Sequence, residues 1–362
     1  MKKHYYWIDL LRFICALLVV LAHYRGHFFV EYGLLPDNQK NIYTQILYFL
    51  TRLGEEPVLV FFVMSGFLVG GTSIKKILDN NVNTQSYFVD RSVRILLPLL
   101  ASSVMVIIIN LITKVQIPFK EIIGSIFSLQ GIITNVSHNQ PLWSLTYEVW
   151  FYILIGCIMV ISKSKGWGLL FPLFILAICI FIFMKLKPLY LLILLIGTIA
   201  FLLPRENIRF IRTKILALAI LLGFSFILLQ STSESKSLTI TFFSFIDREI
   251  ATILLALIAS LLINYLVVAR PKTKIGIKIE KFSSRLSAFS YTLYLTHYPL
   301  ISLLDNWGFT KNTKIELLSI SYYLLAVLIS LIIAYLIYLI SEKQTNLVKN
   351  LIKERFGISK NI

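Results

Sequence analysis

Acidic residues are scarce in this chain, and cysteines are scarcer still. The 362 residues include 18 Asp and Glu against 35 Lys and Arg, and charged residues of both signs make up only 15% of the sequence. Soluble globular domains rarely combine so little charge with 57% hydrophobic residues. The three cysteines, Cys15, Cys157 and Cys179, lie inside apolar runs and have no paired spacing. This excludes a thiolate metal site or a disulfide framework and predicts buried free thiols.

Long apolar runs predict an all-α, polytopic membrane protein. Runs of about 20 apolar residues match a hydrocarbon core about 30 Å thick, and helices are the default because lipid satisfies no backbone polar group. The sequence predicts a bundle of about ten transmembrane helices, at residues 7–29, 53–71, 93–113, 143–161, 167–184, 189–204, 214–230, 250–269, 286–304 and 318–340. The amphipathic segment 119–133 is too short to cross, so we expect an interfacial or re-entrant helix there.

The formal net charge of +17 has a simpler explanation than a nucleic-acid partner. If the N-terminus is cytoplasmic, the inside segments carry roughly twice as many lysines and arginines as the outside segments, which is the bias of membrane proteins. We therefore expect an N-in, C-in protein with the lipid bilayer, and no nucleic acid, as a partner. The first residues are not expected to be a cleaved signal, because Asp9 and Arg12 interrupt the apolar stretch and no small-residue cleavage site follows.

Three titratable residues on three different predicted helices fall in the outer half of the bilayer. At a rise of about 1.5 Å per residue, His23 lies about 24 Å from Trp7, Glu148 about 7 Å below Trp143, and His297 about 16 Å from the inner end of its helix. Intramembrane ionisable residues usually face a bundle interior or a wet cavity and are functional. The alternative is a buried polar network that only orients the helices.

The first helix carries a polar stripe. Arg12 and His23 are eleven positions apart, so at 100° per residue they share a face, and Asp9 lies one turn from Arg12 and can pair with it. This stripe suggests a substrate whose anionic part is held near the cytoplasm and which reacts further out.

A second group of cations lies near the cytoplasmic surface. Arg91 and Arg94 lie on the same side of a predicted helix start, and Lys75 and Lys76 stand in the preceding loop. Guanidinium groups suit phosphates, and the free donors of a helix N-terminus would add to them. Positive-inside topology alone explains the same charges equally well.

Five motifs occur in order along the chain: LLRFICALLVVLAHY, FFVMSGFLVG at residues 61–70, RSVR, WSLTYEVWFY and SYTLYLTHYPL. Together they resemble the acyltransferase-3 family of integral membrane O-acyltransferases, over nearly the whole chain. Glu342 resembles that family's terminal glutamate, although the proline that usually follows is missing. The stretch GEEPVL, with Glu55 and Glu56, replaces a commoner glycine-valine-aspartate pattern, so the outer mouth is expected to be specialised. We expect a membrane acyltransferase domain over 1–345, a short basic cytoplasmic tail over 346–362, and no extracytoplasmic esterase-like domain.

The resemblance implies transfer of an acyl group, commonly acetyl, from cytoplasmic acyl-CoA to a hydroxyl of a surface or lipid-linked carbohydrate. Acetyl-CoA would be a cosubstrate, with no tightly bound cofactor and no metal. His23 is the expected base, since an alcohol needs one at neutral pH. Glu148 either orients that imidazole, as the third member of a triad does, or holds the acceptor. The remaining assignments fall into two sets. Acyl-CoA binding is assigned to Arg12, Arg91, Arg94, Lys75 and Lys76, and acceptor or oxyanion contacts to Ser65, His297, Asp9, Glu55 and Glu56.

Other functions are compatible with the same residues. Intramembrane His, Glu and Arg also describe a proton-coupled transporter or exporter, although the chain shows no paired halves with matching broken helices. A structural partner in glycan assembly is the third class. A covalent acyl-His or acyl-Ser intermediate is open as well. The expected location is the cytoplasmic membrane of a bacterium, and neither the acceptor nor the oligomeric state follows from the sequence.

Overall fold

The computed structural model describes residues 5–135, 137–204, 211–231, 247–269 and 274–358. Within these residues the chain is helical and contains no β-strand, only isolated bridges. It divides into two compact units: unit 1 comprises residues 1–61 and 205–335, and unit 2 comprises residues 62–204 and 336–362. The boundaries pass through helix α3 (Glu56–Ser65) and helix α14 (Leu317–Ile340).

Unit 1 is built around α1, which packs against α11, α12 and α13. The helices of this unit, besides parts of α3 and α14, are α1 (Tyr6–Phe28), α2 (Ile42–Thr51), α10 (Ile211–Ser231), α11 (Arg248–Val268), α12 (Lys274–Ser287) and α13 (Ser290–Asn306). The end of α1 is tied to the loop after α13, because the side-chain amide of Asn312 donates to the carbonyl of Phe28 at 3.0 Å. The hydroxyl of Tyr323 donates to the carbonyl of Leu21 at 3.2 Å.

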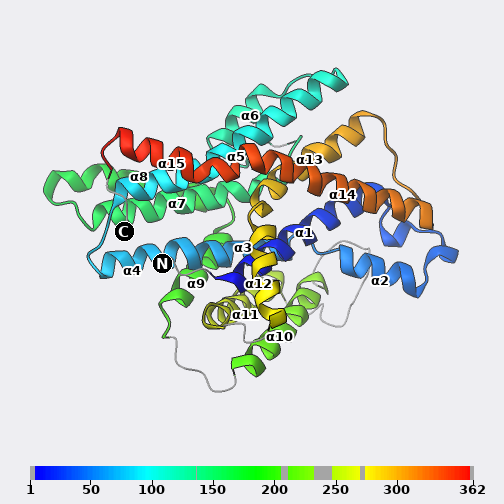
Figure 1. Ribbon diagram of the computed structural model, residues 1–362, viewed down its shortest axis with the longest axis horizontal. Coiled ribbons are helices and arrows are strands. Elements are labelled where there is room, and N and C mark those ends of the chain that lie inside the picture. Colours follow the sequence, from blue (N-terminus) through cyan, green and yellow to red (C-terminus); the bar gives the residue numbers. More distant parts are fainter. Residues whose placement is uncertain (1–4, 136, 205–210, 232–246, 270–273, 359–362) are drawn as a thin grey trace. The chain divides into compact units, whose positions relative to one another are not determined.

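Unit 2 gathers the remaining helices. They are α4 (Thr72–Leu78), α5 (Thr84–Thr113), α6 (Phe119–Ile126), α7 (Trp143–Ile161), α8 (Leu170–Lys185), α9 (Pro188–Leu202) and α15 (Thr345–Arg355). α7 packs against α8, α5 and α9, and α15 lies alongside α5 (Figure 1). Short 3₁₀ turns precede α7, α8 and α15, at Gln140–Leu142, Gly166–Leu169 and Glu342–Gln344.

Glycines allow two backbones of unit 2 to cross closely. A Cβ atom at Gly66 would lie 1.9 Å from the carbonyl oxygen of Leu194, and one at Gly197 would lie 2.2 Å from that of Val63. Only glycine permits such an approach. The segment Gly66–Gly71 is a π-helical continuation of α3, so Ser65 lies within a continuous helical segment.

The multi-pass, all-α architecture is confirmed. Eight helical segments of the described chain are long and apolar enough to cross a membrane, and they coincide with eight of the ten expected spans. The other two expected spans correspond to α9, with 15 residues, and α13, with 17 residues. The count of ten and the N-in orientation remain predictions. The three cysteines are buried and free, as expected.

The structure tests two local predictions, the start of the helix near Arg91 and the conformation of segment 119–133. The expected helix start at Arg91 is wrong: α5 begins at Thr84, because the side chain of Asn83 accepts from the backbone amide of Ser86 at 2.9 Å and caps the helix. The free donors of that N-terminus are therefore about two turns away from Arg91. Segment 119–133 contains the eight-residue α6 followed by turns, and eight residues rise only about 12 Å, too little to cross.

Candidate active site

The two intramembrane histidines of unit 1 contact each other. His23 lies on α1 and His297 on α13, 274 positions apart in sequence, and Nδ1 of His23 is 3.0 Å from Nε2 of His297. The planes of their rings are nearly parallel, with an angle of 19° between them. His297 is fully buried, whereas His23 is half-buried. One imidazole is thus enclosed by protein while the other keeps an open side.

The hydrogen bonds fix which nitrogen of each neutral ring carries the proton. Nδ1 of His297 lies 3.2 Å from the carbonyl oxygen of Leu293, one turn earlier on α13. A carbonyl only accepts, so Nδ1 of His297 is the protonated nitrogen and its Nε2 is an acceptor. Nδ1 of His23 must then donate to that Nε2. This leaves Nε2 of His23 with a lone pair, the form that a general base requires.

An aromatic and an acidic side chain lie next to the pair, toward the C-terminal end of α1. The ring of Tyr298 stands edge-on to both His23 and His27, with centroids 5.7 and 6.0 Å away. Nδ1 of His27, one turn further along α1 than His23, lies 3.0 Å from a carboxylate oxygen of Asp305. The sequence did not assign His27, and its spacing of four residues from His23 was the available signal.

Arg12 occupies the same helix nearer to the N-terminus. Its Nη1 lies 3.7 Å from a carboxylate oxygen of Asp9, and the two side chains are 20% and 16% exposed. The predicted pairing on α1 is therefore present in the structure.

Glu148 belongs to a compact cluster of unit 2. The hydroxyl of Tyr152, one turn later on α7, donates to the carboxylate of Glu148. The hydroxyl of Ser65 lies 3.3 Å from the same carboxylate oxygen and 3.2 Å from the hydroxyl of Tyr152. A carboxylate in an apolar helix is costly unless hydroxyls such as these satisfy it. The sequence did not assign Tyr152 as a partner of Glu148, although the spacing of four residues on one helix was the available signal.

Arg91 connects this cluster to the N-terminal part of α5. Its guanidinium carbon lies 5.6 Å from the ring centre of Tyr152 and 5.9 Å from that of Tyr87. The hydroxyl of Tyr87 donates to the carbonyl of Tyr152 at 2.9 Å, which holds both rings in place. Nε of Arg91 is buried and has no hydrogen-bond partner within the part of the chain that the structure describes. Arg94 lies one turn further along α5 and is half-buried.

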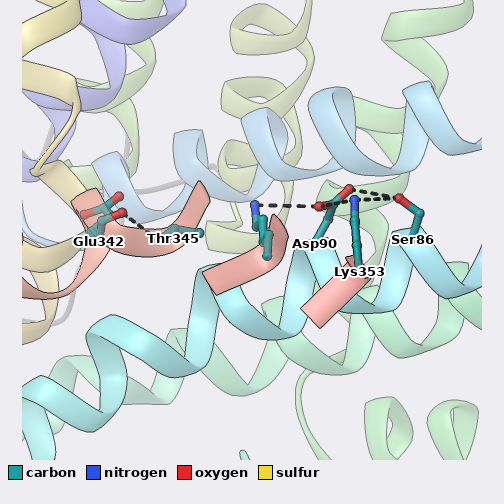
Figure 2. A network of polar contacts seen from close by, with 6 residues as sticks. Ser86, Asp90, Glu342, Thr345 and Lys353 are labelled. Carbon is teal, nitrogen blue, oxygen red and sulfur yellow. Dashed lines mark hydrogen bonds and ion pairs between the residues drawn. The ribbon is translucent and has the colours of Figure 1, made fainter. Parts of the chain in front are cut away.

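The C-terminal helix brings two further lysines to this region. Figure 2 shows Lys353 of α15 beside Asp90 and Ser86 of α5: its Nζ donates to the Asp90 carboxylate at 2.9 Å and to the Ser86 hydroxyl at 2.7 Å. Nζ of Lys349 lies 4.0 Å from the same carboxylate. The last part of the predicted tail, residues 359–362, lies outside the described residues, but the rest of it forms a helix whose lysines face α5.

The other predicted residues lie apart from these clusters. Lys75 and Lys76 are exposed in the last turn of α4. In unit 1, the Glu55 carboxylate forms an ion pair with the guanidinium of Arg248, and Glu56 at the start of α3 is buried, 6% exposed. Glu342 stands in the turn before α15, where its carbonyl accepts from the Thr345 hydroxyl at 2.6 Å (Figure 2).

The structure therefore brings His23 together with His297, and Glu148 together with Ser65. His23 and Glu148 belong to different units, so their partnership remains a prediction. No group of three or more His, Cys, Asp or Glu side chains suited to a metal occurs within the described ranges.

A family model described as an acyltransferase domain, Acyl_transf_3, matches residues 5–339. No curated protein and no solved structure matches the chain.

Proposed function

The chain belongs to the acyltransferase-3 family and is a multi-pass membrane acyltransferase, and from this we propose that it transfers an acetyl group from cytoplasmic acetyl-CoA to a hydroxyl of a cell-surface or lipid-linked carbohydrate. The observation that carries the proposal is the hydrogen bond between Nδ1 of His23 and Nε2 of His297, at 3.0 Å. It supports a half-buried imidazole with a free lone pair, which an alcohol acceptor needs. The cytoplasmic membrane of a bacterium is the proposed location.

In the proposed reaction, Nε2 of His23 takes the proton of the acceptor hydroxyl. The hydroxyl oxygen attacks the thioester carbonyl carbon, the C–S bond breaks, and the coenzyme A thiolate receives the proton from His23. The products are an acetyl ester and free coenzyme A. As the positive charge develops on His23, the Leu293–His297 chain orients the ring through its other nitrogen, which is the part that the third member of a triad plays.

The anionic part of the donor is assigned to the cations of α5 and α15. Nε of Arg91 has no hydrogen-bond partner among the described residues. Lys349 lies near enough to Arg91 and Arg94 for their charges to interact. Guanidinium forks favour phosphate oxygens. Arg12, Lys75 and Lys76 remain proposed contributors to the same binding. Asp90 holds the lysine side chains of α15 against α5 and so shapes this basic surface.

Glu148 and Ser65 keep two proposed roles. Glu148 either supports the charged form of His23 or binds acceptor hydroxyls, and Ser65, His297 and Asp9 are proposed for oxyanion or acceptor contacts. The cluster with Tyr152 is compatible with either role, because two hydroxyls already hold the carboxylate in place.

The test is turnover of acetyl-CoA by the purified full-length protein in lipid nanodiscs. Free thiol and acetylated sugar are measured together, with the His23→Ala variant as the control. Acetyl transfer that His23→Ala abolishes supports the proposal. Flux of a substrate across proteoliposomes without thioester cleavage would instead support the transporter alternative and overturn this one.

A further inference from the structure

Unit 1 contains a polar cavity that the proposed chemistry does not use. It lies where the end of α1, the start of α3, the end of α10 and the start of α11 meet, and its volume is about 380 Å³. Pockets for small molecules have volumes of about 300–1,000 Å³, so the cavity is large enough for a ligand. Unlike most such pockets, it is lined mainly by polar and charged side chains.

Two lining side chains keep buried polar atoms without partners. Both amide atoms of Gln230, Oε1 and Nε2, lack a hydrogen bond to any described residue, although the side chain is only 4% exposed. Nε of Arg25 is unpartnered in the same sense. An unsatisfied buried polar group destabilises the folded protein, so such groups in a cavity wall indicate a ligand that completes them. A primary amide donates and accepts at once, which suits sugar hydroxyls.

The charges of the wall favour an acidic ligand. Four lining side chains are cationic: Arg25, Arg52, Arg248 and Lys311. Three are carboxylates: Glu31, Glu55 and Glu56. The wall thus has a surplus of one positive charge, which a single carboxylate or phosphate on the ligand balances. The carboxylates supply acceptors for hydroxyls, a combination that fits a hydroxyl-rich ring with one anionic group.

The cavity reaches α1 about one turn further along the helix than the half-buried His23, which does not itself line it. Gly26 lines it and is three positions after His23 on α1, a rise of about 4.5 Å and a rotation of about 60° from the same face. A Cβ atom at Gly26 would meet nothing within 4 Å, so the space next to this turn of α1 is open.

We propose that this cavity binds an acidic sugar unit of the acceptor, with its hydroxyls on Gln230 and Glu56 and its anionic group on Arg25. The inference rests on the proposed function, because it names the acceptor class for the same histidine. Glu55 contributes indirectly, by holding Arg248 at the rim through their ion pair.

The experiment measures binding of glucuronic acid and of glucose by saturation-transfer NMR, with full-length protein in nanodiscs and no acetyl-CoA. The two sugars differ only in the carboxylate at one carbon. We expect saturable binding of glucuronic acid and at least tenfold weaker binding of glucose. Gly26→Phe fills the open space and should abolish the signal, whereas Gly223→Phe, the same change at an exposed and open glycine of α10, should keep it.

Gln230→Leu is the second variant, and it should raise the Kd for glucuronic acid about tenfold through the lost hydrogen bonds. The melting temperature shows whether each variant is folded. If Gly26→Phe does not fold, the binding measured with Gln230→Leu tests the proposal. Absent binding of glucuronic acid, equal binding of glucose, or unchanged binding in the folded variants would each overturn the inference. Because the sugar is measured without acetyl-CoA, a failure of thioester turnover would contradict the proposed function while leaving this binding result intact.

Discussion

In unit 1 two histidines of the apolar helices hydrogen-bond to each other and to a backbone carbonyl. In unit 2 two carboxylates, Glu148 and Asp90, accept from hydroxyls and from lysine. A neutral imidazole chain can take up a proton at its open end, whereas the carboxylates of unit 2 accept hydrogen bonds and hold neighbouring side chains in place. The comparison suggests a division of labour, with proton transfer in unit 1 and charge binding in unit 2.

The largest expected effect is all-or-none. Labelling of an introduced cysteine shows on which side of the membrane a loop of each unit lies. Asn38, in the loop before α2, and Asn81, in the loop after α4, are both exposed. In an N-in protein, a cysteine at Asn38 should react with an impermeant maleimide in intact cells, and a cysteine at Asn81 only after permeabilisation. The three native cysteines are buried, so they contribute little background. Labelling of both positions in intact cells would end the N-in topology.

Removal of the proposed base, His23, should have the second-largest effect. His23→Ala is expected to lower kcat for acetyl transfer about 10²–10⁴-fold, the usual contribution of a general base, while the protein still elutes as a folded species. His27→Ala, the matched change one turn along the same helix, should cost less than about tenfold. Equal losses in the two variants would show that the histidines of unit 1 act through packing and that no single one is the base.

These residues show which features of the fold and of the candidate site can be predicted from the sequence. The apolar runs identified the helices because bilayer thickness dictates their length, and the motifs identified the family. The start of α5 was misplaced because the polar residues 84–92 have little hydropathy signal, although Asn83 is a recognisable cap. The contact between His23 and His297 spans 274 positions, and only tertiary packing brings such residues together. The position of each histidine along its own helix predicted its depth in the membrane but not the distance between the two side chains.

The sequence also did not predict the role of side chains whose function depends on the residues packed around them. Gln230 ends an apolar helix and gave no sign of the cavity that it lines. Lys349 and Lys353 looked like a basic tail, although their spacing of four residues places them on one face of α15. Sequence therefore indicated which side chains are unusual, while packing decided which of them meet.

A double-mutant cycle tests whether the two units act together. Glu148→Gln keeps the shape of the side chain but removes its charge, so the rate should fall about 10²-fold, the loss typical of one preorganised polar group. Combined with His23→Ala, it should add little, because residues that act as one unit fail together. Glu121→Gln, at a carboxylate that accepts from Ser137 at 2.9 Å, is the control and should leave the rate within about twofold.

If the two losses multiply instead, unit 1 and unit 2 contribute independently. Glu148 would then be an acceptor ligand, and the Michaelis constant for the acceptor should rise in Glu148→Gln.

The hydrogen bonds from His23 to His297 and from His297 to the carbonyl of Leu293 predict that activity responds in a graded way to substitutions of His297. His297→Leu removes the acceptor for Nδ1 of His23 and should lower kcat about 10–100-fold, as loss of an orienting partner typically does, with the KM for acetyl-CoA unchanged. His297→Gln keeps an oxygen acceptor and should recover much of that loss. Equal activity in the two variants would mean that His297 only fills space between α1 and α13.

The smallest expected effect concerns the cations of unit 2 and falls on donor binding alone. Replacing Arg91 and Arg94 together by lysine keeps the positive charge that topology needs but removes the planar forks that match phosphate oxygens. The Kd for coenzyme A, measured by calorimetry on protein in nanodiscs, should rise about tenfold, the equivalent of one lost charge-assisted hydrogen bond. Labelling at Asn38 and Asn81 should be unchanged. Arg285→Lys on α12, an exposed arginine of unit 1, is the matched control and should bind coenzyme A as the parent protein does. Parent-like affinity in the Arg91 and Arg94 double variant would contradict the assignment of charge binding to unit 2, because these arginines would then serve only the orientation of the chain.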